Sequence, residues 1–231
     1  MIRSTLLGMA LAAGLAGAAQ AAVLTYFDVD NGVAPGSPFP QSAGAAAVFV
    51  NEVGPLSLLT FEGLAAGAVP SFSPAAGVTL SRTGFNYGGG YTGVSTYEYG
   101  LAALGFNTTP GGTNWFGAPQ GTMTFTFATP ITAWGAFLTG AESTIGPQIL
   151  ASFDNGTPQQ VAIPSTSAGG VQFIGITSDT AFSSITLSKI TDSIDAWGID
   201  DVYYTTQATP EPATAALLAA GLLGLAARRR R

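Results

Sequence analysis

The sequence predicts an all-β protein body, a two-sheet antiparallel sandwich of jelly-roll type with one short helix near its start. Apolar residues fall in short runs separated by Gly, Pro, Asn or Asp, which is typical of many short strands joined by tight turns. Residues 122–127 alternate strictly between threonine and apolar side chains, as a strand with one buried face does. The segment between the two unlike chain ends, residues 22–208, is long enough for one such core.

Ten strands are expected, each bounded by turn residues. In chain order they span residues 23–28, 56–62, 78–82, 122–127, 131–138, 149–153, 159–163, 171–176, 183–187 and 198–204. Asp154, Asn155 and Gly156 mark a hairpin turn between two of them, because Asn and Gly tolerate positive φ.

One segment favours a helix instead. Residues 42–53 are rich in alanine and almost continuously apolar, and Gly54 and Pro55 follow as a stop signal. The valines in this segment would also suit a strand, so that alternative stays open. Residues 84–120 hold many Gly, Tyr and Asn residues and are expected to form long loops around one or two strands. Such loops often carry binding residues.

The first 21 residues have the pattern of a secretory signal. Arg3 supplies the positive start, residues 6–18 form an uncharged apolar run, and residues 19–21 read Ala-Gln-Ala, a cleavage site for signal peptidase. We therefore expect the mature chain to begin at Ala22. The alternative is an N-terminal membrane anchor, which needs about 20 apolar residues and no such cleavage site.

The other end has the pattern of a membrane helix. Residues 213–227 carry no charge, and four arginines follow as Arg228, Arg229, Arg230 and Arg231. Arginines stay on the cytoplasmic side of a membrane, so the helix is expected to leave the protein body outside. The predicted division is therefore a signal peptide at 1–21, an extracytoplasmic sandwich at 22–208 and a C-terminal segment at 209–231.

Charge and missing residue types exclude several function classes. Between the two ends there are twelve acidic residues and only two basic ones, Arg82 and Lys189, so the body has a formal charge near −10. Such a surface lacks the basic contacts that bind nucleic acids. The chain has no Cys and no His, which rules out disulfides, cysteine-bound zinc, cysteine nucleophiles and histidine-dependent triads.

The acidic residues cluster late in the body. Asp192, Asp195, Asp200 and Asp201 fall within ten residues, and Glu62 ends an early strand that a jelly roll can place beside the last one. Carboxylates are the ligands that calcium prefers, and like charges brought together need a cation. The sequence therefore suggests a calcium site at Glu62, Asp195, Asp200 and Asp201. The alternative is that these carboxylates are solvated or cap turns.

Aromatic residues in the Gly-rich middle suggest a glycan-binding surface, because flat rings stack on sugars. The candidates are Tyr87, Tyr91, Tyr97 and Trp115. The alternative is that they pack at the edge of the sandwich. A glycosidase would need two carboxyl groups about 5–9.5 Å apart, and nothing in the sequence pairs the available Glu98 and Glu142. We therefore expect a protein that is not an enzyme.

The C-terminal segment resembles a known protein-sorting signal. Pro210, Glu211 and Pro212, then the apolar helix, then the arginine cluster are similar to the PEP-CTERM sorting signal of Gram-negative bacteria. The resemblance implies recognition by exosortase, a membrane-embedded Cys-dependent transpeptidase that cuts near the Pro-Glu-Pro. It also implies a chain anchored transiently in the inner membrane with its body in the periplasm. Its destination would then be the cell surface or the extracellular matrix.

The body resembles exported domains that carry the same signal. The similarity lies in residues 60–64, 125–131, 173–178 and 197–202. Such domains are similar to calcium-supported, lectin-like jelly rolls and are often encoded with exopolysaccharide systems. This implies a surface or matrix protein associated with exopolysaccharide and biofilm. Two other functions stay open: a polysaccharide-acting hydrolase on the same fold, and a purely structural surface subunit.

Overall fold

The computed structural model describes residues 23–67, 69–84, 92–98, 104–117, 121–143, 148–162, 169–189 and 197–206. The expected signal peptide and sorting segment lie outside these residues. Eleven strands and one helix are present: β1 (Val23–Asn31), α1 (Pro40–Val53), β2 (Leu56–Leu59), β3 (Ser71–Ala75), β4 (Val78–Arg82), β5 (Gly93–Ser95), β6 (Trp115–Gly117), β7 (Thr122–Thr139), β8 (Ile149–Phe153), β9 (Gln159–Ala162), β10 (Gly170–Lys189) and β11 (Gly198–Thr205). Within the described residues, no helix is long and apolar enough to cross a membrane.

All eleven strands belong to one antiparallel sheet, which confirms the predicted all-β class. The sheet is continuous because β7 and β10 pair with each other in both halves, with irregular register between the halves, and change their outer partners half-way. The first half of β7 pairs with β4 and the second half with β11, while β10 pairs first with β1 and then with β8. The predicted division into two separate sheets is therefore not confirmed.

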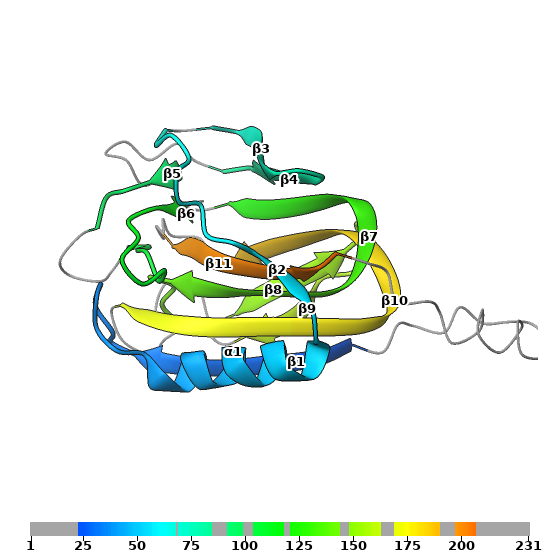
Figure 1. Ribbon diagram of the computed structural model, residues 1–231, viewed down its shortest axis with the longest axis horizontal. Coiled ribbons are helices and arrows are strands. Elements are labelled where there is room, and N and C mark those ends of the chain that lie inside the picture. The colour runs from blue at the N-terminus through cyan, green and yellow to red at the C-terminus, as the bar shows by residue number, and fades with distance from the viewer. Residues whose placement is uncertain are drawn as a thin grey trace, which may run out of the picture.

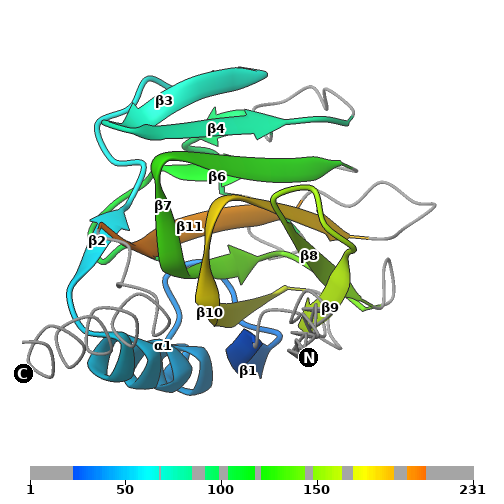
Figure 2. The ribbon, with the colours of Figure 1, turned by 90° about the vertical axis from the view of Figure 1, so that its right-hand side faces the viewer.

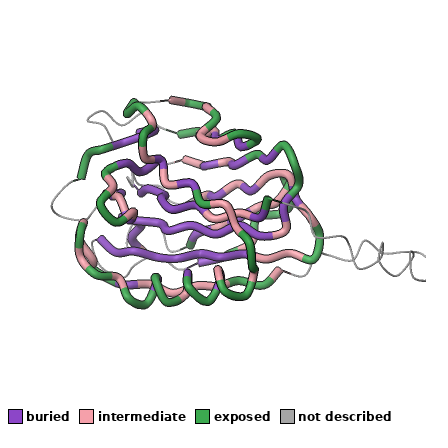
Figure 3. Tube along the Cα trace, in the orientation of Figure 1, coloured by how far each residue is buried: buried purple, intermediate pink, exposed green. Residues whose placement is uncertain are grey.

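The sheet curves, so that its two halves share one apolar core (Figures 1 and 2). Phe125, in the first half of β7, packs against Trp134 in the second half at a ring distance of 5.7 Å. The exposed residues 128–130 lie between the two halves, where the strand turns. Figure 3 shows that buried residues concentrate along the central strands. Burial of this face supplies the main driving force of folding.

Helix α1 covers the outer face of the sheet beside β1 and β10 (Figure 1). It includes the predicted helix at 42–53 and ends, as expected, at Gly54. Phe49 is fully buried and lies over Gly135 and Gly175, which face each other in neighbouring strands. A Cβ atom at Gly175 would lie 2.6 Å from Phe49 Cδ2, so the two glycines make the space for the ring.

A strand residue accepts hydrogen bonds from the first amide groups of this helix. The first amide groups of a helix have no partner inside it. Asp30 of β1 accepts hydrogen bonds from the N–H of Gln41 at 3.2 Å and from the N–H and hydroxyl of Ser42 at 2.8 and 2.6 Å. A negative charge at a helix N-terminus is also favourable. Asp30 therefore fixes α1 in its place above the sheet.

The strand predictions were largely confirmed, with two corrections. The two strands predicted at 122–127 and 131–138 are one long strand, β7. The two predicted at 171–176 and 183–187 are likewise one long strand, β10. Three short strands, β3, β5 and β6, were not predicted individually, although β5 and β6 lie in the segment where one or two strands were expected. The last strand, β11, lies between β6 and β7 and places the acidic residues described next.

Candidate functional site

A bulge in β11 brings two neighbouring carboxyl groups to the same place. Asp200 pairs with Phe137 of β7, but the next pair is Tyr203 with Gly135, so β11 holds one extra residue here. Asp201 takes the left-handed conformation, with φ of 46°. Side chains of consecutive strand residues normally point to opposite faces. The bulge lets Asp200 and Asp201 both reach Thr108.

Two threonines from a distant loop hold this pair of acids. The Oδ2 atom of Asp200 accepts hydrogen bonds from the N–H of Thr108 at 2.7 Å and of Thr109 at 3.2 Å. The Thr108 hydroxyl lies 3.1 Å from Oδ2 of Asp200 and 3.0 Å from Oδ2 of Asp201. The Thr109 hydroxyl donates to Oδ1 of Asp201 at 2.6 Å. The two threonines thus bridge both carboxyl groups.

A third carboxylate holds the other end of the same loop. The Oε1 atom of Glu62 accepts hydrogen bonds from the N–H groups of Thr113 and Asn114, both at 2.8 Å. The Asn114 amide donates to the carbonyls of Phe61 and Leu64 at 3.3 and 2.9 Å. Phe61 also has a positive φ, 61°, so the chain bends sharply before Glu62. Residues 108–114 therefore form a loop held by three acids, here called the acid-held loop.

Strand pairing explains why the three acids reach the same loop. β2 pairs with β11, with Leu59 opposite Val202, and Glu62 follows β2 by three residues. The charge of Glu62 is close enough to raise the pKa of Asp201. Glu62 and the two aspartates of β11 therefore bond to the same loop. Asp195, the fourth predicted calcium ligand, lies outside the described residues, as does Asp192.

Burial disfavours the ionised form of both aspartates. Asp200 is fully buried, and this desolvation, followed by the charge of Asp201, raises its pKa to about 8 against the opposing effect of the Thr108 and Thr109 N–H groups. Burial also raises the pKa of Asp201, with Glu62 adding to the effect and the two threonine hydroxyls opposing it. Burial and then the two aspartates raise the pKa of Tyr203 in the same way. Without a bound cation, burial therefore favours the protonated form of Asp200.

One oxygen of this site has no hydrogen-bond partner. Oδ1 of Asp200 is buried, and no donor reaches it. A buried acceptor left without a partner is costly and uncommon. It is also a candidate ligand for a cation. Within the described part of the chain, however, no group of three or more acidic residues is close enough to hold a metal ion by itself.

The aromatic candidates fall into different environments. Trp115 corrects the expectation: its ring is fully buried against Gly105 and Gly198, where a Cβ atom would collide with it, and cannot stack on a sugar. Its indole N–H donates to the carbonyl of Tyr97 at 3.1 Å. Tyr97 itself is 44% exposed. Tyr87 and Tyr91 lie outside the described residues.

The two glutamates considered for hydrolysis also lie in different environments. Glu98 is exposed and accepts a hydrogen bond from the N–H of Asn107 at 3.3 Å. Glu142 is almost fully buried and accepts one from the N–H of Gly169 at 3.1 Å. A glycosidase needs both carboxyl groups on one open cleft. A buried Glu142 bound to the backbone does not offer such a cleft to a sugar.

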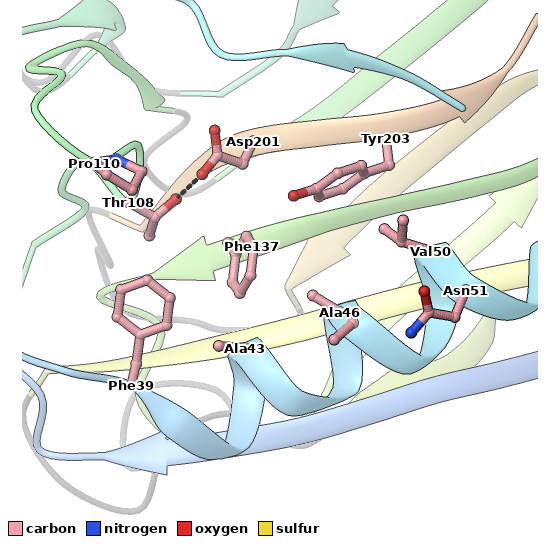
Figure 4. Close-up of a pocket in the computed structure, with 11 residues that line it drawn as sticks. Phe39, Ala43, Ala46, Val50, Asn51, Thr108, Pro110, Phe137, Asp201 and Tyr203 are labelled. Carbon is pink, nitrogen blue, oxygen red and sulfur yellow. Dashed lines mark hydrogen bonds between the residues drawn. The ribbon is translucent and has the colours of Figure 1, made fainter. Parts of the chain in front are cut away.

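A cavity of about 530 Å³ opens beside Asp201, between α1 and the sheet (Figure 4). Eleven residues line it: Phe39, Ala43, Ala46, Ala47, Val50, Asn51, Thr108, Pro110, Phe137, Asp201 and Tyr203. Its volume lies within the range of small-molecule sites. Sequence reasoning missed this cavity and missed Thr108 and Thr109. The only signal for the threonines was their place in a segment expected to form binding loops.

The described body ends at Thr206, and two residues later a recognised segment begins. Residues 208–231 match the family model of the PEP-CTERM protein-sorting motif. The chain carries a PEP-CTERM sorting motif. The PEP-CTERM motif implies an exported protein with a C-terminal sorting signal that exosortase processes. It includes all of the predicted sorting residues, Pro210, Glu211, Pro212 and Arg228 to Arg231, which lie outside the described structure.

The rest of the chain has no counterpart in the comparisons. Neither the curated proteins nor the solved structures gave a match. The PEP-CTERM motif covers 24 residues at the C-terminus, so it indicates where the protein is sorted and not what the body does.

Proposed function

We propose that this chain is a non-catalytic surface or extracellular-matrix protein that binds exopolysaccharide in a biofilm and is stabilised by calcium. The observation that carries the proposal is the acid-held loop. Glu62, Asp200 and Asp201 all accept hydrogen bonds from residues 108–114, so these three side chains position a surface loop. A loop fixed in this way on a rigid sheet is an arrangement used for binding.

Calcium supplies what this arrangement lacks. Ionising all three acids would crowd negative charge in a body that is already near −10, and Oδ1 of Asp200 has no donor. A divalent cation offsets both costs, since calcium takes six to eight oxygen ligands from carboxylates, carbonyls and water. Asp200 and Asp201 supply the first oxygens in this proposal. Asp195 supplies a further carboxylate from the segment directly before β11.

The glycan contact is proposed beside the same loop. Tyr97 is exposed, and its carbonyl is held by the Trp115 indole, so the backbone under the ring is fixed. Glu98, the next residue, accepts a hydrogen bond from Asn107, which directly precedes the acid-held loop. An aromatic face next to a carboxylate suits a sugar ring and its hydroxyl groups. Ordering of the loop by calcium would therefore order the glycan contact.

Sorting places this body where it meets polysaccharide. In the proposed sequence of events, signal peptidase removes residues 1–21, and the C-terminal helix holds the chain in the inner membrane. The folded body, whose curved sheet we regard as a jelly-roll-like sandwich, then lies in the periplasm. Exosortase cuts near Pro210, Glu211 and Pro212, and the body passes to the cell surface or the matrix.

A glycan-binding assay tests this proposal. The protein is incubated with immobilised exopolysaccharide from its host, once with calcium and once with EDTA. We expect retention with calcium, weaker retention with EDTA and loss of retention in Tyr97→Ala. The matched control is Leu58→Ala, which removes an exposed apolar side chain from β2. Release of reducing sugar would instead show a hydrolase, and no retention in any condition would favour a purely structural subunit.

A further inference from the structure

The cavity between α1 and the sheet has an apolar wall that is built from one face of the helix. Ala43, Ala46, Ala47 and Val50 follow the helical spacing of three and four residues, so they lie side by side. The small alanine side chains leave the space that larger ones would fill. Opposite them stands Phe137 of β7, and Phe39 packs against it edge to face at 5.5 Å. The cavity therefore accepts a compact apolar group.

Its other wall is polar and acidic. Figure 4 shows Asp201 and Tyr203 on β11, across the cavity from α1, with Thr108 next to Asp201. Each oxygen of Asp201 accepts one threonine hydroxyl bond, and a carboxylate offers about four lone-pair sites. None of the lining residues is basic. The Asp201 carboxylate therefore has acceptor capacity left and no positive partner in the cavity wall.

We propose that this cavity binds a small organic cation, a primary ammonium carried on a compact aromatic or aliphatic group. The ammonium donates to Asp201, and the apolar group lies between the alanines of α1 and Phe137. Charge selects this ligand, because the ionised Asp201 repels an anion, and a neutral alcohol gains a hydrogen bond without the attraction between opposite charges. Tyr203 adds a ring beside the positive charge.

This site needs no metal, although it shares Asp201 with the proposed calcium site. The two proposals are separated by titrating the protein in EDTA, where the calcium proposal makes no claim. The ligands are benzylamine, benzyl alcohol and benzoate, which carry the same ring on a positive, a neutral and a negative group. Isothermal titration calorimetry is run on the full chain in detergent, with a titration into empty micelles subtracted. We expect binding of benzylamine, affinity lower by about tenfold or more for the alcohol, and none for benzoate.

Two variants and one control variant locate the binding. Ala47→Phe places a ring in the cavity and should abolish benzylamine binding, whereas Val48→Phe, on the next and exposed helix position outside the cavity, should leave it unchanged. Asp201→Asn should reduce benzylamine to the affinity of the alcohol; asparagine tolerates the left-handed backbone at this position. Equal affinity for all three ligands, or unchanged benzylamine binding in Ala47→Phe or Asp201→Asn, would overturn the proposal.

Discussion

Thr108 and Asp200 are 92 residues apart in the chain and are joined by two hydrogen bonds to one oxygen. The N–H of Thr108 lies 2.7 Å and its hydroxyl 3.1 Å from Oδ2 of Asp200. The same hydroxyl reaches Asp201, so one threonine links the acid-held loop to both aspartates of the β11 bulge. The position of the loop therefore depends on this side chain.

Thr108→Val tests that dependence. Valine keeps the shape of threonine but removes the hydroxyl shared by the two carboxyl groups. We predict a loss of about 1–3 kcal/mol in the free energy of unfolding, measured by urea denaturation. Thr79→Val is the matched control, since Thr79 is exposed on β4, and it should change stability by no more than about 0.5 kcal/mol. Equal effects of the two variants would show that the hydroxyl does not hold the loop.

The raised pKa of Asp200 predicts how stability depends on pH without calcium. The folded protein keeps the Asp200 proton up to about pH 8, whereas the unfolded chain releases it near the ordinary value of about 4. Between these values the unfolded state binds fewer protons, so the free energy of unfolding falls as pH rises. The contribution is fully present below about pH 4, is lost through about pH 8 and is flat above. Burial of Asp201 acts in the same direction.

Asp200→Asn isolates this contribution, because asparagine has the shape of the protonated acid and does not titrate. In EDTA we predict that the difference in stability between wild type and variant changes by a few kcal/mol between pH 4.5 and 8.5, on the order expected for a buried acid. Urea denaturation at fixed ionic strength measures it at each pH. A difference that stays constant, or one in which wild type gains stability with rising pH, would mean that Asp200 is ionised in the folded protein.

The packing of α1 on the sheet gives a third prediction. Gly175→Ala would place a Cβ atom 2.6 Å from Phe49 Cδ2, so the ring must move, and we predict a destabilisation of about 1–3 kcal/mol. Gly44→Ala is the control. Gly44 lies inside α1 with open space around it, and alanine there should stabilise the helix by up to about 1 kcal/mol. Thermal melting of both variants decides, and a Gly175→Ala protein as stable as wild type would refute the close packing.

The sequence predicted the strands well because their apolar runs end at Gly, Pro and Asn. The predicted division into two separate sheets is not confirmed, for a physical reason. Residues 128–130 and 178–180 are polar or break the alternation, yet β7 and β10 continue through them as bends. Local pattern marks where a side chain leaves the core, but it does not show whether hydrogen bonding continues past that point.

The site was predicted only in part. Carboxylates show in the sequence, and strand order suggested that Glu62 and Asp200 would meet. The bulge in β11 could not be predicted from the sequence, because the left-handed conformation of Asp201 results from pairing with β7 and not from a local motif. Thr108 was missed because a loop has no periodicity. Trp115 was misread for a related reason: its neighbours in sequence are Gly-rich loops, whereas its neighbours in space are Gly105 and Gly198.

The sorting motif gives a prediction about location. Replacing Arg228, Arg229, Arg230 and Arg231 with serine removes the positive charges that hold the C-terminus on the cytoplasmic side. We predict that the body still folds but that membrane retention and cutting near Glu211 fail. Fractionation followed by mass spectrometry of the C-terminus measures both. The matched control replaces Arg82, in the body, with serine, which should leave sorting intact; normal processing of the fourfold variant would contradict the assignment.

The central claim, that calcium supports the acid-held loop, is tested most directly by melting curves of the protein in EDTA, in magnesium and in calcium at matched ionic strength. A ligand at a hundredfold excess over its Kd stabilises the folded state by about 2.7 kcal/mol, or about 5–10 °C for a body of this size. We predict this rise with calcium but not with magnesium, its loss in Asp200→Asn and its persistence in Asp154→Asn, where the aspartate lies in an exposed turn. Equal midpoints in all three solutions would contradict the account.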